Sequence, residues 1–240
     1  MKKKCLLIFS GGLDSTTCLF WALDNYDEVY TITFDYNQRH IIEKEMAQKT
    51  ISLAKSIKKK QISYFGFKID LSTIGASALT DFTIDVPKNR DINSNEIPIT
   101  YVPFRNGIFL SIAVAYAETL GVTDVIGGWN VIDYSGYPDC RPNFLKSFQQ
   151  TATLGTKIGQ KKPFNIIAPL IGLTKSQIIK LGKKHDADYS YAYSCYEGKE
   201  EFCGECDSCI LRAQGFKEAG YLDDYIVRLA TSSKETKLHP

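Results

Sequence analysis

The stretch that decides the fold is CLLIFSGGLDSTTCLFWAL, residues 5–23. An apolar run ends at Ser10, two glycines follow, and apolar residues resume after an acid and three hydroxyl residues. A strand that passes through a glycine turn into a helix is typical of phosphate-binding α/β proteins. The reason is that the free N–H groups and the positive dipole end of the helix face the anion. We therefore expect a phosphate site at residues 10–15.

The rest of the chain repeats this alternation of strand and helix. Apolar, β-branched or aromatic runs predict strands, and apolar residues at helical spacing predict helices. The expected strands are 4–9, 28–36, 60–69 and 122–126, and the expected helices are 15–23, 40–57, 105–121 and a segment opened by a capping box of Thr174 and Gln177. In the third helix Ile108, Ile112, Tyr116 and Leu120 fall on one face, and residues 86–98 have loop composition. This order predicts an α/β protein with a Rossmann-like, mostly parallel sheet and helices on both faces.

Composition and charge limit the class of protein, its expected location and its expected partners. Of 240 residues, 44% are hydrophobic and 23% charged, which is ordinary for a globular protein, and the net charge of +2 gives no basic footprint for nucleic acid. Residues 1–4 resemble the start of a signal peptide, but the apolar run 5–9 is too short to continue one. No run approaches the roughly 18 apolar residues of a membrane span. We expect a cytoplasmic protein with no membrane contact and no direct nucleic-acid partner.

The loop itself is neither a Walker A loop nor a GxGxxG fingerprint. Gly11 and Gly12 allow the backbone to approach an anion closely, and Ser10 and Ser15 add hydroxyl donors. A carboxylate in a phosphate loop requires a cation, so Asp14 is expected to hold Mg²⁺ against the phosphates. The plainer alternative is a strand–turn–helix joint with a serine cap, but the whole hexad in this position favours a phosphate site.

Four of the seven cysteines lie within fifteen residues, with the spacing C-x7-C-x2-C-x2-C: Cys195, Cys203, Cys206 and Cys209. Four thiolates suit tetrahedral Zn²⁺, and a [4Fe–4S] cluster is the alternative. Because four cysteines leave no open coordination position, the site is expected to be structural. Cys140 stands alone, and a lone cysteine is more often a small buried residue than a nucleophile.

The SGGxDS hexad resembles the PP-loop of the N-type ATP pyrophosphatases. Six further stretches resemble 7-cyano-7-deazaguanine synthases, in the same order and over nearly the whole chain: FDYNQRH (34–40), SALTD (77–81), YVPFRNGIFLSIA (101–113), DYSGYPDCRPNF (133–144), APLIGLTKSQII (168–179) and SCYEG…CGECDSCILRAQGF (194–216). Three positions depart from the residues usual in that family: Asn37 replaces a glycine, Gly107 a common threonine, and Trp129 a small or aliphatic residue.

The resemblance implies AMP transfer rather than γ-phosphoryl transfer, because the loop of that group holds the β,γ-pyrophosphate while a substrate oxygen attacks the α-phosphate. It implies an ATP-dependent ligase of queuosine biosynthesis that converts 7-carboxy-7-deazaguanine and free ammonia into 7-cyano-7-deazaguanine (preQ0). Adenylated intermediates and an amide lie on the way. It also implies zinc rather than iron–sulfur at the cysteines, ATP with Mg²⁺ as co-substrate, and a homodimer.

Site residues follow from the loop, from the cysteine spacing and from this resemblance. Those expected to bind ATP are Phe9, Ser10, Gly11, Gly12, Leu13, Asp14, Ser15, Thr16, Thr17, Cys18 and Leu19. The catalytic candidates are Ser10, Asp14, Ser15, Arg105 and Lys157, and Asn106, Lys175 and His40 are further candidates for phosphate or adenylate. Residues expected at the deazaguanine and its carboxylate are Asp133, Tyr134, Tyr137, Asp139 and Arg141. The expected metal ligands are Cys195, Cys203, Cys206 and Cys209.

Two parts are expected in the chain: residues 1–190 as the PP-loop ATP pyrophosphatase domain, and 191–240 as a C-terminal helical, zinc-binding segment packed on that domain. Two other functions remain open. One is a related PP-loop enzyme that stops at the amide or adenylates another substrate. The other is a zinc-ribbon RNA-binding module that merely binds ATP, which the small net charge disfavours.

Overall fold

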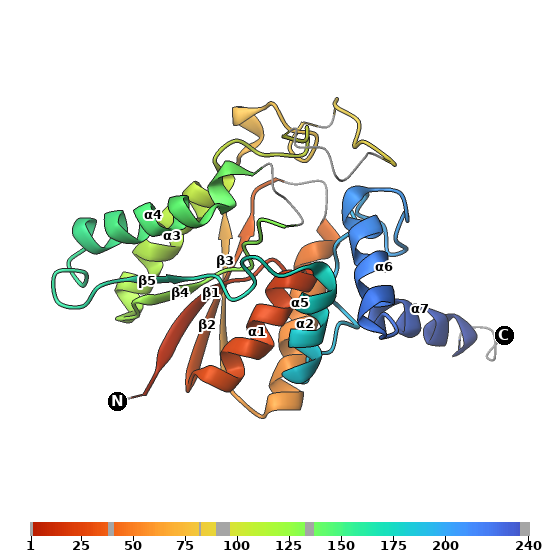
Figure 1. The fold of residues 1–240 in the computed structure, drawn as a ribbon, viewed down its shortest axis with the longest axis horizontal. Coiled ribbons are helices and arrows are strands. Elements are labelled where there is room, and N and C mark those ends of the chain that lie inside the picture. Colours follow the sequence, from red (N-terminus) through yellow and green to blue (C-terminus); the bar gives the residue numbers. More distant parts are fainter. Residues whose placement is uncertain (1, 38–40, 82, 90–96, 133–136, 236–240) are drawn as a thin grey trace.

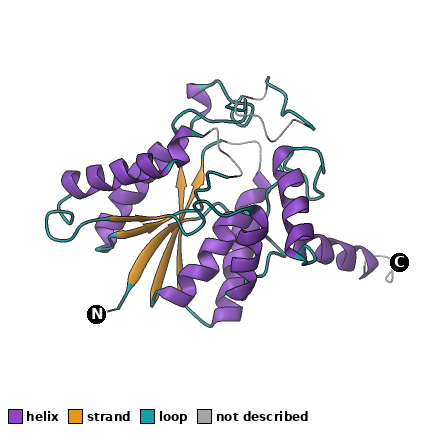
Figure 2. Cartoon of the chain, in the orientation of Figure 1, coloured by secondary structure: helices purple, strands orange, loops and turns teal. Residues whose placement is uncertain are grey.

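The computed structural model describes residues 2–37, 41–81, 83–89, 97–132 and 137–235. Five strands form one sheet in the order β3-β2-β1-β4-β5, and every neighbouring pair is parallel. The strands are β1 (Lys4–Ile8), β2 (Glu28–Asp35), β3 (Ile62–Lys68), β4 (Asp124–Ile126) and β5 (Asn165–Ile167). Figure 2 shows them side by side at the centre of the molecule. The predicted α/β class is confirmed, and the sheet is parallel throughout.

Seven helices accompany the sheet in the described part of the chain. They are α1 (Leu13–Asn25), α2 (Ile41–Lys58), α3 (Arg105–Leu120), α4 (Pro142–Gly155), α5 (Lys175–Lys184), α6 (Asp207–Ala219) and α7 (Asp224–Glu235). Each predicted strand and helix is present, with ends that shift by at most two residues. The sequence patterns predicted a helical C-terminal segment without the bounds of α6 and α7, and they did not predict α4 or β5. Their apolar residues are sparse or, in β5, span only three positions.

Both faces of the sheet are covered, as predicted. Successive side chains of a strand point to opposite faces, and β1 divides in this way. Cys5 and Leu7 belong to the core under α1, α2 and α5, while Leu6 belongs to the core under α3 and α4. Figure 1 shows these helix groups on either side of the strands. A strand that is covered on both faces has no polar positions, which explains the continuous apolar run at residues 5–9.

The core-facing side of α3 differs from the predicted one. Its fully buried residues include Leu110, Ala113 and Ala117. The predicted row, which contains Ile108 and Tyr116, is only partly buried around that core. Since α3 is apolar over most of its circumference, spacing alone could not identify the inner side. The small side chains of the true inner row bring the helix close to the sheet.

The C-terminal part attaches to the sheet domain through α6. Phe216 of α6 enters the core under α1 and α5. A Cβ on Gly215 would lie 2.4 Å from the Lys175 side chain, so this glycine permits the close approach of α6 to α5. A third cluster joins the cysteines with Tyr193 and Tyr225. The division at residue 190 stays a prediction. Within the described ranges, no helix combines the length and apolar character that crossing a membrane requires.

The strand order sets the place of a ligand site. The chain moves from β1 to β2 on one side and later to β4 on the other side of β1. In open parallel sheets such a switch point leaves a crevice outside the carboxyl ends of the strands, and ligands bind there. The segment 9–15 follows the carboxyl end of β1 and therefore lies at this crevice.

Candidate functional site

A cavity of 650 Å³ lies at the switch point. It is lined by the ends of β1, β2, β3 and β4, by the first turns of α1, α2, α3 and α5, and by Tyr193, Ser194 and Tyr196 before α6. The volume falls in the range of pockets that hold small molecules and cofactors. Of the residues predicted for ATP, six line it: Phe9, Ser10, Gly12, Leu13, Asp14 and Ser15.

The phosphate loop, residues 9–15, is shaped by hydrogen bonds within itself. Ser15 Oγ accepts from the Gly11 N–H at 3.1 Å and lies 3.1 Å from Ser10 Oγ. Ser10 Oγ accepts from the Gly12 N–H at 3.3 Å. Helix α1 begins at Leu13, and no side chain caps it. The first N–H groups of α1 therefore have no helical acceptor and are available to an anion in the cavity.

Gly11 is a glycine for a different reason than predicted. Its φ of 84° lies in the left-handed region, and a Cβ there would come within 2.8 Å of the Ala47 Cβ on α2. Gly11 does not line the cavity, and its carbonyl accepts the Tyr193 N–H at 3.0 Å. The turn and the packing of α2 require this glycine, whereas Gly12 faces the cavity.

Lys175 brings a cation to the loop carboxylate. Its Nζ lies 2.6 Å from Asp14 Oδ1, and the two side chains are only 10% and 19% exposed. Lys175 is the first residue of α5 and directly follows Thr174, the N-cap residue of the predicted capping box. Thr174 and Gln177 form this box reciprocally, so the prediction is confirmed. The box fixes the start of α5 and thereby the position of Lys175 over the loop.

The remaining residues predicted for ATP lie on the inner side of α1. Thr16, Thr17, Cys18 and Leu19 are buried and do not line the cavity. The Thr17 hydroxyl lies 2.7 Å from that of Tyr189, and burial raises the pKa of the Cys18 thiol well above its usual range. The structure places these four residues in the core that anchors α1 beneath the loop.

The opposite wall of the cavity is aromatic and carries one arginine. Arg105 opens α3, and its Nη1 donates to the Tyr36 hydroxyl at 3.2 Å. Its guanidinium lies 5.9 Å from the centre of the Phe109 ring. Tyr137 also lines this wall, 3.3 Å from the Thr100 hydroxyl. Burial raises the pKa of Tyr36 and of Tyr137, so both phenols stay protonated at neutral pH.

Cys140 lines the same wall but is not activated. Burial raises the pKa of its thiol to about 12, and it accepts a hydrogen bond from Asn106 Nδ2 at 3.4 Å. A nucleophilic cysteine requires a lowered pKa. The structure thus supports the interpretation of Cys140 as a buried packing residue.

Three further predicted site residues also lie outside the cavity lining. Asp139 is 2% exposed, and its Oδ2 accepts the Asn106 N–H at the start of α3, 2.9 Å away. Arg141 is exposed at the start of α4. Lys157 is also exposed and follows the end of α4, near the amino end of β5 and thus at the opposite edge of the sheet. Asp133, Tyr134 and His40 lie outside the described residues.

Sequence reasoning missed the part of the wall that the C-terminal segment supplies. Ser194, Ser208 and Arg212 line the cavity. Arg212 is 2% exposed, holds Asp223 with two nitrogens, and donates from Nη1 to the Ala192 carbonyl at 2.6 Å. These two serines and the arginine form no sequence motif whose spacing would have indicated a binding site. The only available signal was their closeness in sequence to the cysteines.

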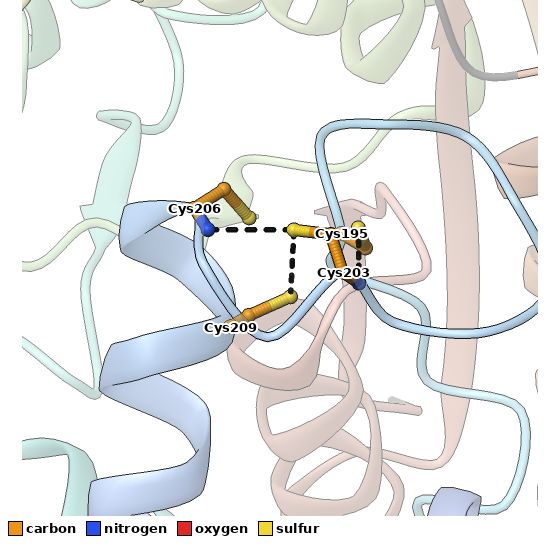
Figure 3. A group of neighbouring side chains, drawn as sticks. All are labelled: Cys195, Cys203, Cys206 and Cys209. Carbon is orange, nitrogen blue, oxygen red and sulfur yellow. Dashed lines mark hydrogen bonds between the residues drawn. The ribbon is translucent and has the colours of Figure 1, made fainter. Parts of the chain in front are cut away.

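The predicted group of four cysteines is present. Figure 3 shows Cys206 and Cys209 from the start of α6 pointing toward Cys195 and Cys203 of the preceding loop. The four sulfur atoms all lie within 4.8 Å of one another. Backbone N–H groups donate to two of the sulfurs: Cys203 and Glu197 to Cys195 Sγ, and Cys206 and Glu205 to Cys203 Sγ, at 3.3–3.5 Å. Such donors stabilise thiolates, the form that binds metal.

The cysteine segment, residues 193–209, also touches the phosphate loop. Tyr193 donates its N–H to the Gly11 carbonyl at 3.0 Å and is two residues from Cys195. Ser208 lies between Cys206 and Cys209 and lines the cavity. The cysteine segment and the phosphate loop therefore share a wall of the cavity.

A parallel sheet of this order, with a Ser-Gly-Gly loop after β1 at the switch point, defines the PP-loop class of ATP-using α/β proteins. The fold is similar to that of a 4-thiouridine synthetase solved with RNA and bound ATP, with a TM-score of 0.51 and 17% identity. That match covers 91% of this chain and 53% of the other.

Residues 4–220 match the family model described as "Queuosine biosynthesis protein QueC". The chain is 52% identical over 225 residues to the 7-cyano-7-deazaguanine synthase of Thermoplasma volcanium, covering 93% of this chain and 90% of that protein. It is 48% identical over 222 residues to that of Acetivibrio thermocellus, covering 92% and 96%. The chain therefore belongs to the QueC family of 7-cyano-7-deazaguanine synthases.

Proposed function

We propose that this protein converts 7-carboxy-7-deazaguanine and ammonia into 7-cyano-7-deazaguanine at the expense of ATP. The observation that carries the proposal is the family match over residues 4–220 together with the cavity, where a phosphate loop and Arg105 line opposite walls. One wall suits a polyphosphate, and the other offers a cation for a carboxylate together with rings for a flat base.

The reaction needs two activations of the same carbon. First, a carboxylate oxygen attacks the α-phosphate of ATP and pyrophosphate leaves. Ammonia then attacks the acyl carbon, and AMP leaves with that oxygen to give the amide. Next, the amide oxygen attacks the α-phosphate of a second ATP and pyrophosphate leaves. Loss of AMP and of both protons from the nitrogen then leaves the nitrile. Both carboxylate oxygens thus depart in AMP, because oxide and hydroxide are poor leaving groups at neutral pH.

The main tasks of the chain's own residues are to position the substrates and to neutralise the charge of the phosphates. The first N–H groups of α1 and the Lys175 ammonium face the place where pyrophosphate charge develops, and Arg105 orients the substrate carboxylate across the cavity. The Asp14 carboxylate lines the cavity at the start of α1, in a place where it could hold Mg²⁺, which neutralises phosphate charge when bound. Phe9 and Leu13 complete this wall, and Thr16–Leu19 anchor it from the core.

We infer that the four cysteines bind one structural Zn²⁺. Four sulfurs at about 2.3 Å from one zinc ion lie about 3.8 Å from one another, and the separations of up to 4.8 Å fit this closely spaced arrangement. A [4Fe–4S] cluster needs wider spacing, because each cysteine binds a different iron. One zinc per chain in a colourless protein is expected from metal analysis, and a brown protein would contradict zinc.

Product analysis tests the proposed reaction. Incubation with ATP, ammonium and the 7-carboxy base, followed by mass spectrometry, should give two AMP and two pyrophosphate per nitrile, a transient amide and no ADP. The amide supplied as substrate should be converted with a single ATP. ADP and phosphate would refute the PP-loop chemistry. One AMP with amide as the final product would identify the amide-forming relative instead.

We further propose that the protein is a cytoplasmic homodimer without a direct nucleic-acid partner, and that residues 191–240 form its zinc-binding segment. The net charge of +2 supports the absence of an RNA footprint. Light scattering tests the dimer. A filter-binding titration with salt tests the RNA-binding alternative, which predicts tight binding that weakens steeply as salt rises.

A further inference from the structure

Helix α3 begins after a residue in an unusual backbone conformation. Phe104, its N-cap residue, has a φ of 53° and a ψ of 23°, which lie in the left-handed region. It follows Pro103 in a turn that the Arg105 N–H closes by donating to the Val102 carbonyl at 3.2 Å. Turns with a positive φ at the third residue normally have glycine or asparagine there, because a larger side chain makes this conformation costly. A bulky aromatic residue at this position is an outlier that the surrounding structure must stabilise.

The ring of Phe104 is held by two neighbours. A Cβ on Gly107, three residues further along, would lie 2.4 Å from the ring, so the ring rests on the bare backbone of this glycine. The φ of Gly107 is not positive, so the backbone conformation does not require a glycine here. The ring also meets Phe144 of α4 edge-on, with the ring centres 5.8 Å apart. Gly107, where the chain departs from the usual threonine, therefore leaves the room that the Phe104 ring occupies.

The turn leads directly into Arg105, the first helical residue of α3, which lines the cavity. The N–H groups on either side of Arg105 are bonded within the protein. That of Phe104 donates to the Tyr101 hydroxyl at 3.0 Å, and that of Asn106 donates to the Asp139 carboxylate at 2.9 Å. In contrast to the first N–H groups of α1, these donors are already used. The start of α3 thus offers positive charge to a ligand through the Arg105 side chain, whose direction follows from the turn before it.

We propose that Phe104 is a positioning residue, whose left-handed turn, locked by the ring over Gly107, aims the Arg105 guanidinium at the substrate carboxylate. The proposal rests on the proposed function, in which Arg105 orients that carboxylate. Phe104 acts through Arg105, because Phe104 itself does not line the cavity. A glycine in the turn would adopt the same conformation among many others, whereas the locked phenylalanine restricts the turn to one. Such preorganisation strengthens binding, because less conformational freedom is lost when the ligand arrives.

Two substitutions that both remove the ring separate the backbone from the ring. Alanine disfavours the left-handed region, so Phe104→Ala should let the turn relax, whereas Phe104→Gly should keep it. Calorimetric titration with 7-carboxy-7-deazaguanine and with 7-deazaguanine, which lacks the carboxylate, measures the preference for the carboxylate. Phe104→Ala should lower this preference about 10-fold, the usual loss of a charge-assisted hydrogen bond, and Phe104→Gly by less than about threefold.

The other readouts exclude a general structural defect. Binding of 7-deazaguanine should stay unchanged in both variants, and their melting temperatures should stay within a few degrees of wild type. Phe104→Tyr, which keeps the ring, should retain the full preference. Equal losses in Phe104→Ala and Phe104→Gly would mean that the ring acts without the turn, and no loss in either would mean that the turn does not aim Arg105. Both outcomes overturn the proposal.

A second pair of variants tests the lock over Gly107. Gly107→Ala favours the helix but displaces the Phe104 ring, so it should also lower the carboxylate preference about 10-fold. In the double variant Phe104→Gly/Gly107→Ala no ring is displaced, and the preference should return to that of Phe104→Gly alone. An unchanged preference in Gly107→Ala, or losses that add in the double variant, would overturn the lock.

Arg105→Met shows which claim fails, since it should remove the carboxylate preference in every background. A preference that Arg105→Met removes and Phe104→Ala keeps overturns the positioning proposal alone. A wild-type protein without any preference contradicts the proposed function as well. These titrations need no turnover, so a failure to form nitrile despite the expected binding would refute the proposed function and leave the positioning of Arg105 in place.

Discussion

The phosphate loop and the cysteine segment face the same cavity, but they obtain their shapes differently. The loop is fixed by the strand before it, the helix after it and hydrogen bonds among Ser10, Gly12 and Ser15. Residues 186–206 contain no helix or strand, and the four sulfurs are positioned by backbone N–H groups and by their own cluster. The loop is thus preorganised by the fold, whereas the proposed zinc ion would hold the cysteine segment together. Substitutions in the loop should therefore lower the rate of the reaction, and substitutions in the cysteine segment should lower the stability of the fold.

The largest effect is expected at the cysteines. Cys206→Ser should lose the metal and lower the melting temperature of the C-terminal segment by many degrees. Metal binding is folding energy at such a site, and it amounts to about 10–16 kcal/mol in zinc-finger peptides. Metal content and calorimetric melting measure it. Cys5→Ala, a buried cysteine outside the cluster, is the control and should keep one metal per chain. A melting curve of Cys206→Ser that matches wild type would refute a structural metal.

The loop should show the opposite behaviour. Asp14→Asn removes the carboxylate proposed to hold Mg²⁺ beside the leaving pyrophosphate, and loss of one electrostatic stabiliser typically costs about 100-fold to 1,000-fold in rate. The melting temperature should fall by only a few degrees, because Asn keeps the shape of Asp14 but loses the ion pair with the largely buried Lys175. Pyrophosphate release and thermal melting, measured on one preparation, separate chemistry from folding. A folded variant with near-normal pyrophosphate release would remove Asp14 from the mechanism.

The contact between the two regions predicts an intermediate effect. Because the Tyr193 N–H is bonded to the Gly11 carbonyl, loss of the metal should loosen one side of the loop. We expect a chelator to weaken pyrophosphate binding by about 10-fold, within the usual range of coupling between sites. By reciprocity, pyrophosphate should tighten metal binding by the same factor, which competition with a chromogenic chelator at equilibrium measures. Equal metal affinities with and without pyrophosphate would show that the two regions are adjacent but not coupled.

Sequence patterns predicted the features that are determined by residues close together in the sequence. The strand–glycine–helix joint, the capping box of α5 and the cysteine spacing are local, and each was found. The inner side of α3 was mispredicted, because nearly every side of that helix is apolar. Asp139 illustrates the remaining limit. Its type suggested contact with the base, but its buried carboxylate accepts the Asn106 N–H, a contact between residues 33 positions apart.

Lys157 gives the smallest expected effect and the sharpest check on the boundary of the site. Its type and place in sequence suggested a catalytic cation, yet it is exposed near the amino end of β5, while the cavity opens at the carboxyl ends of the strands. Lys157→Ala should therefore keep turnover within about twofold, as for most exposed substitutions. A loss of 100-fold would mean that Lys157 reaches the cavity of a second chain. In that case, mixing Lys157→Ala with Asp14→Asn should restore activity, because one mixed dimer site would be intact. No recovery on mixing, with the loss still present, would place Lys157 in the cavity of its own chain and contradict the arrangement described above.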